Sequence, residues 1–102
     1  MNDRAREVLI DAALKGQKQI KGQLHDGKGG VCAMGALHLT LHDGDHLAAH
    51  ACYRKGSPDC WFSAVWQAFD LAGEVAEIEI ANDLHGWDFL TIARKIGVES
   101  GA

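Results

Sequence analysis

The spacing of apolar residues along the chain predicts a series of short amphipathic helices. The first helix begins at Asp3, which is a suitable N-cap, and stops near Gly16. Its inner face carries apolar residues three and four positions apart, namely Val8, Leu9, Ala12 and Ala13. Residues 17–30 have a weaker pattern, with Ile20 and Leu24 as their only large apolar side chains, and His25-Asp26-Gly27-Lys28-Gly29-Gly30 is typical of a turn.

Two further helices are expected in the middle of the chain. One runs from about Val31 to His42, and Asp43-Gly44-Asp45 then breaks the pattern. Asp45 is the expected N-cap of a short helix that ends near residue 51. Gly35 lowers the helix propensity of its segment, so we expect it to allow the close approach of another backbone.

The C-terminal half adds three predicted helices. Ser57-Pro58-Asp59 has the cap, proline and acid of a helix start, and it precedes an aromatic-rich segment. Residues 74–83 suit a strand or a helix, and helix is favoured because no second strand is evident. Asp88 is the expected cap of a last helix that ends at Gly97, followed by a frayed tail over 98–102. The expected fold is therefore mainly α: one compact domain over 1–102, with five or six short helices and at most one short strand pair.

Composition narrows the classes of function. The chain has 102 residues, of which 47% are hydrophobic, and no apolar run approaches the roughly 20 residues of a membrane helix. The N-terminus is polar, so we expect a cytoplasmic protein with no membrane contact. The net charge is −4 and the basic residues are dispersed, which disfavours nucleic acid and favours a protein partner or a small-molecule ligand. Three cysteines without CxxC spacing predict reduced thiols.

Cys32 is the first candidate for chemistry. A cysteine at a helix N-terminus has its thiolate favoured by the helix dipole, and a histidine base with an acidic residue to orient it would complete a triad. His85 and Asp83 are available for these roles. The simpler alternative is a small core residue beside Gly35.

Asn82 and Asp83 have a structural alternative of their own. Short polar side chains ahead of a glycine often bond to the local backbone and hold a turn. They are also suited to cap the helix that follows Cys32 from across the fold. Asn82 is kept as a candidate binding residue.

The histidines are the candidate metal ligands. Four of them recur at every fourth position, namely His38, His42, His46 and His50. Residues four apart share one face of a helix, as in metal-binding helices. A hairpin at the break would turn both pairs into one cavity, with Asp43, Asp45 or Cys52 added, to bind zinc or another divalent ion. The alternative, which needs no cofactor, is that these histidines are the solvated edges of two helices.

The aromatic segment is the candidate interaction surface. It carries Trp61, Phe62, Trp66 and Phe69 on more than one helix face. One face suits the core, and the other suits a protein partner or a homodimer, because tryptophan is enriched at interface hot spots. A fully wrapped central helix is the alternative.

Two segments together give a resemblance. The glycine turn before Val31-Cys32-Ala33-Met34-Gly35-Ala36-Leu37 and the segment Asn82-Asp83-Leu84-His85-Gly86 before the last helix resemble a family of small phage and bacterial proteins. Those proteins share a Cys-x-x-Gly helix and a C-terminal Asn-Asp…Gly motif, and they commonly carry a tryptophan beside one of them. This chain has Ile80-Ala81 beside the second motif instead. The resemblance implies the fold and a mobile-element context, and no activity.

The function predicted from the sequence is a small protein-interaction or ligand-sequestering domain, phage-derived and directed against a host defence. No coherent catalytic set is evident, so a role without catalysis is favoured. One alternative is a cysteine-dependent hydrolase or transferase that uses Cys32 with a histidine. A further alternative is a small metal-binding protein built on the four spaced histidines.

Overall fold

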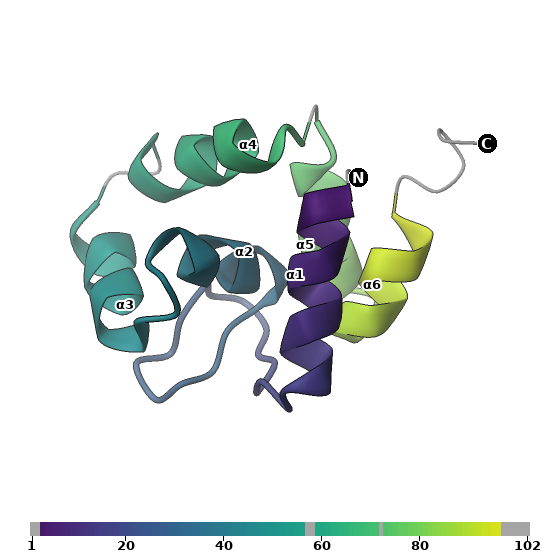
Figure 1. Ribbon diagram of the computed structural model, residues 1–102, viewed down its shortest axis with the longest axis horizontal. Coiled ribbons are helices and arrows are strands. Elements are labelled where there is room, and N and C mark those ends of the chain that lie inside the picture. The colour runs from purple at the N-terminus through teal and green to yellow at the C-terminus, as the bar shows by residue number, and fades with distance from the viewer. Residues whose placement is uncertain (1–2, 57–58, 72, 97–102) are drawn as a thin grey trace.

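The computed structural model describes residues 3–56, 59–71 and 73–96, with the backbone alone at residues 59 and 60. Over these residues the chain folds into six α-helices and one π-helical turn (Figure 1). The elements are α1 (Asp3–Leu14), α2 (Ala33–Leu41), α3 (His46–Lys55), η1 (Asp59–Ser63), α4 (Ala64–Phe69), α5 (Val75–Asp83) and α6 (Phe89–Lys95). The mainly α prediction is confirmed, including the helix over residues 75–83. Pairing of extended backbone is limited, in the described part, to isolated bridges of Val31 with Gln19 and His25.

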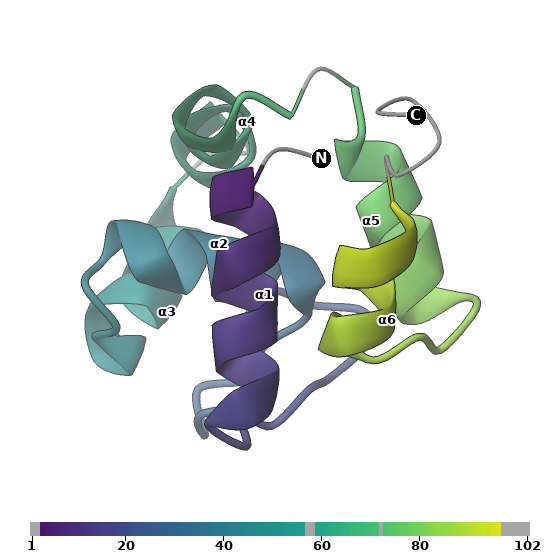
Figure 2. The same cartoon turned by 45° about the vertical axis from the view of Figure 1, so that its right-hand side comes forward.

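The centre of the fold is α2. It contacts α1, α3, α4 and α5, and α6 packs against α1 and α5 (Figures 1 and 2). The first six residues of α2, 33–38, are all buried, which suits a helix made almost entirely of small and apolar residues. Helices α5 and α6 lie beyond α1, whereas α3 lies at the opposite end of the molecule (Figure 1). The core is therefore built around α2.

Local capping signals set two helix boundaries as predicted. Asp45 accepts a hydrogen bond from the Ala48 N–H (3.1 Å), and Asp88 accepts one from the Thr91 N–H (2.8 Å). Asp3, in contrast, lies within the first turn of α1 instead of capping it. The Ser57-Pro58 start, the stop at Gly97 and the tail over 98–102 lie outside the described residues.

Two helix boundaries differ from the prediction because tertiary contacts intervene. Helix α2 begins two residues late, since Val31 pairs with the preceding loop and Cys32 becomes the N-cap. Helix α3 continues to Lys55, and Tyr53 in its last turns packs against the core. None of the described helices is both long and apolar enough to span a membrane.

Gly35 has the role expected of it. A side chain there would collide with the backbone carbonyl of Leu24, and the same carbonyl accepts a hydrogen bond from the Cys32 N–H (3.2 Å). The absence of a Cβ therefore lets the loop between α1 and α2 lie directly on the first turn of α2. This contact fixes the position of the loop, which carries His25.

Candidate functional site

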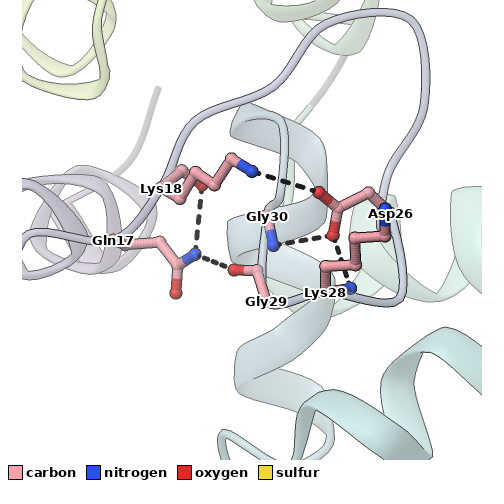
Figure 3. Close-up of polar contacts among 6 residues, drawn as sticks. All are labelled: Gln17, Lys18, Asp26, Lys28, Gly29 and Gly30. Carbon is pink, nitrogen blue, oxygen red and sulfur yellow. Dashed lines mark hydrogen bonds and ion pairs between the residues drawn. The ribbon is translucent and has the colours of Figure 1, made fainter.

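The loop between α1 and α2 is held by one aspartate. The Asp26 carboxylate accepts hydrogen bonds from the backbone N–H groups of Lys28 (2.7 Å) and Gly30 (2.8 Å), and Lys18 lies 3.8 Å away as an ion pair (Figure 3). Those two backbone hydrogen bonds lower the pKa of Asp26. The predicted turn is confirmed, and it is an ordered loop in which one carboxylate holds two backbone N–H groups.

A second set of contacts ties the same loop to its own beginning. The Gln17 side-chain amide donates to the Gly29 carbonyl (2.5 Å) and to the Lys18 carbonyl (3.1 Å), as Figure 3 shows. The Val31 N–H donates to the Lys18 carbonyl (3.0 Å). Both ends of the loop are therefore closed, and His25 between them is held against α2.

A cluster of potential metal ligands lies where α2 meets α3. His38 lies in the last turn of α2, His42 is the C-cap that follows this helix, and Cys52 comes from α3. One potential ligand atom from each of the three residues lies within 4.8 Å of the other two. His38 is fully buried, whereas His42 and Cys52 are half-buried. We call these three residues the His-His-Cys cluster.

His25 from the loop adds an outer partner to this cluster. Its Nε2 lies 2.8 Å from Nδ1 of His38, a hydrogen bond in which either ring can donate. Burial is the main cause that lowers the pKa of both histidines to about 4, so both rings are neutral at pH 7. The remaining nitrogens, His25 Nδ1 and His38 Nε2, are buried without a hydrogen-bond partner in the described part of the chain.

The other two spaced histidines lie apart from the cluster. His46 and His50, together with His25 and the loop glycines, line a small cavity of about 20 Å³. Neither of them places a ligand atom in the His-His-Cys cluster. Of the three additional ligands considered from the sequence, Cys52 joins the cluster, whereas Asp45 caps α3 and Asp43 is exposed in the left-handed turn that separates the helices.

Sequence reasoning missed His25 as a site residue. It lies thirteen positions before His38, in a segment without helical periodicity, so no spacing rule connects the two. The backbone pairing of His25 with Val31 brings it to the start of α2. The sequence pattern contains no signal for the pairing of His25 with Val31.

Cys32 is placed as a structural cap. It is buried, and its Sγ accepts a hydrogen bond from the Gly35 N–H (3.3 Å). Burial raises the pKa of the Cys32 thiol to about 11, and the negative charges of Asp83 and Glu79 act in the same direction. Desolvation outweighs the hydrogen bonds from the helix, and the burial of Cys32 agrees with the alternative of a small core residue beside Gly35.

The remaining members of the predicted triad lie on the surface. His85 and Asp83 are both exposed, and the ring of His85 contacts Trp87, with centroids 5.6 Å apart. Asp83 accepts hydrogen bonds from the Gly22 N–H (3.2 Å) and the Asn82 side chain (2.7 Å). These contacts hold backbone and side chains in place.

Asn82 connects three segments of the fold. Its side-chain oxygen accepts from the Ala33 N–H (3.0 Å) and from the Gln19 amide (2.7 Å), and its nitrogen donates to the Ile20 carbonyl (2.9 Å). The suggestion that Asn82 caps the helix after Cys32 from across the fold is confirmed. It is buried, so these bonds satisfy its polar atoms.

The aromatic residues form a chain of ring contacts next to the cluster. Tyr53 contacts His25 and Trp61, with centroids 5.9 and 5.6 Å apart, and Phe62 lies between Trp61 and Trp66. Phe69 is buried, whereas 42% of Trp66 is exposed. The described residues therefore do not cover the aromatic segment of η1 and α4 completely.

Comparison with known proteins gave no match. No family model matches the chain, and no curated protein or solved structure matches it.

Proposed function

We propose that this protein binds a transition-metal ion, with zinc the best-matched ion, through His38, His42 and Cys52. The observation that carries the proposal is the approach of their three ligand atoms to within 4.8 Å of one another. In a tetrahedral zinc site, neighbouring ligand atoms are about 3.3–3.6 Å apart, given Zn–N and Zn–S bonds of about 2.0–2.3 Å. No pair has to close by more than about 1.5 Å, which is within reach of small side-chain rotations.

The donor set selects the class of metal. Two imidazole nitrogens and one thiolate suit zinc and other borderline or soft ions, whereas calcium and magnesium prefer oxygen ligands. Cys52 is a free thiol, and it would lose its proton on binding the ion. His38 is already neutral at pH 7, because burial lowers its pKa to about 4, so its ring needs no deprotonation.

His25 supports the proposed metal site as the outer hydrogen-bond partner of His38. Metal-binding histidines usually donate their second ring N–H to a neighbouring acceptor, which fixes the tautomer. A hydrogen bond donated from Nδ1 of His38 to Nε2 of His25 leaves the lone pair of His38 on Nε2, the atom without another partner. An unpartnered buried polar atom costs about 1–3 kcal/mol, which a bound ion would relieve.

The proposed metal binding agrees with one hypothesis from the sequence, a domain that sequesters a ligand. The ligand of the predicted ligand-sequestering domain would be a metal ion. The protein-interaction and counter-defence roles, and the phage-family resemblance, stay predictions. A hydrolase centred on Cys32 has less support, because the thiol is buried and its pKa is raised.

Metal titration of the metal-free, tag-free full chain tests the proposal. We expect one zinc or cobalt ion per chain, a thiolate-to-cobalt charge-transfer band, and a rise in thermal stability on loading. The variants Cys52→Ser and His42→Ala should lose the binding, and Cys52→Ser should lose the band. The exposed His85 provides a matched control, so His85→Ala should bind normally. Binding that survives unchanged in Cys52→Ser and His42→Ala would overturn the proposal.

A further inference from the structure

The His-His-Cys cluster supplies three ligand atoms where zinc takes four. Within the described part of the chain, no fourth histidine, cysteine or carboxylate brings a ligand atom into the group. Two other potential ligands have different contacts: His25 is hydrogen-bonded to His38 through Nε2, and Asp45 caps α3. Zinc sites with structural roles are closed by four protein ligands, whereas three protein ligands leave one position for an outside ligand.

The burial of the cluster is uneven. His38 is fully buried against the core, but His42 and Cys52 are each half-buried. An ion held by all three would therefore be covered by protein on the side of His38 and reachable by solvent beside the other two ligands. The open position is expected on that accessible side.

The charge of the loaded site selects the kind of outside ligand. A divalent ion bound by one thiolate and two neutral imidazoles keeps one uncompensated positive charge, and a bound ion is the largest local charge in such a site. A monoanion would neutralise the site, whereas a dianion would leave an excess negative charge.

We propose that the metal bound by this cluster takes an exchangeable monoanionic fourth ligand from outside the chain, such as hydroxide or a thiolate. This inference rests on the proposed metal binding. An open, exchangeable position would let the protein hold the ion together with a second molecule, and so pass it on or present it. A closed structural zinc site would not allow this.

The experiment uses the cobalt-loaded full chain and azide as the monoanionic probe. We expect azide to shift the visible absorption bands of the bound cobalt in a saturable manner, while perchlorate at the same ionic strength leaves them unchanged. The same shift should occur in Cys60→Ser, a variant included because the Cys60 side chain lies outside the described residues. The shift should be absent when Cys52→Ser has abolished the thiolate-to-cobalt band.

The two proposals fail in different ways. A chain that takes up no cobalt would overturn the metal site itself. A chain that binds cobalt with the thiolate band but shows no azide response would overturn the open position alone. Loss of cobalt affinity in Cys60→Ser would also overturn it, since the fourth ligand would then come from within the chain.

Discussion

The side-chain oxygen of Asn82 accepts a hydrogen bond from the backbone N–H of Ala33, 49 positions earlier in the sequence. This bond caps the start of α2 from the end of α5. It joins the two motifs on which the sequence resemblance rests. Their joint occurrence thus has a structural explanation in this chain, since one motif satisfies the first turn of the other.

Asn82→Ala should destabilise the fold strongly. The change leaves the Ala33 N–H and the Ile20 carbonyl without their partner, and we expect a loss of about 2–4 kcal/mol in the free energy of unfolding. Urea denaturation measures it. Asp88→Ala removes the exposed cap of α6 and provides the control. We expect it to lower the free energy of unfolding by about 1 kcal/mol. Equal losses in the two variants would contradict a special role for Asn82.

Gly35→Ala should destabilise the protein although alanine favours helix. On helix propensity alone the change would add about 1 kcal/mol of stability. The new Cβ would collide with the Leu24 carbonyl, so we expect a net loss of about 1–3 kcal/mol in urea denaturation. Ala51→Gly, at an exposed position of α3, measures how much helix propensity alone changes the free energy of unfolding. A stabilised Gly35→Ala variant would mean that the loop does not lie on α2 as described.

His25 should act on metal affinity as a positioning residue. His25→Phe keeps a ring but removes the hydrogen bond to His38, and we expect the zinc dissociation constant to rise about 10–100-fold. His25→Gln offers an amide oxygen as acceptor and should restore much of the affinity. Competition with a chromophoric chelator measures the zinc dissociation constant of each variant. Urea denaturation of the metal-free variants measures their stability. If both variants bind zinc like the original chain, His25 has no part in orienting His38.

The two described cysteines should differ in reactivity. Cys52 is half-buried near His42, whereas Cys32 is buried and its pKa is raised to about 11. Iodoacetamide should therefore label Cys52 first in the native protein, and zinc should slow the labelling of Cys52 alone. Peptide mass spectrometry after timed quenching separates the two sites. Fast labelling of Cys32 would revive the hypothesis of a Cys32 nucleophile.

Acid should destabilise the metal-free protein before most carboxylates titrate. The pKa values of His25 and His38 are lowered from 6.5 to about 4 in the folded state, chiefly by burial. Between these values the unfolded chain binds more protons than the folded one, so the free energy of unfolding decreases as the pH falls from about 6.5 to 4. Electrostatic repulsion from His38, and to a smaller extent from His50, His46 and His42, lowers the pKa of His25 further.

Urea denaturation of metal-free protein at several pH values measures this dependence. The His25→Gln variant has one such group fewer and should show a shallower slope. A free energy of unfolding that stays constant from pH 7 to pH 5 would contradict the burial of these two rings as neutral groups.

The sequence by itself determined the helices and half of the candidate site. The caps at Asp45 and Asp88 act on N–H groups three residues away, so their effect is local and readable from the chain. The four-residue spacing likewise places His42, the C-cap of α2, beside His38 in the last turn of that helix, with ring centroids 4.7 Å apart. The same rule paired His46 with His50, but it could not decide whether the two pairs meet.

Only the tertiary structure decided which other residues join His38 and His42. Cys52 reaches them because α3 packs on α2, and His25 reaches His38 because Gly35 lets the loop lie on the same helix. The tertiary structure also placed Cys32 as a buried cap of α2, in agreement with the alternative of a small core residue. Periodicity specifies neighbours within one helix, whereas contacts between elements depend on packing and close backbone approach, which no local pattern encodes.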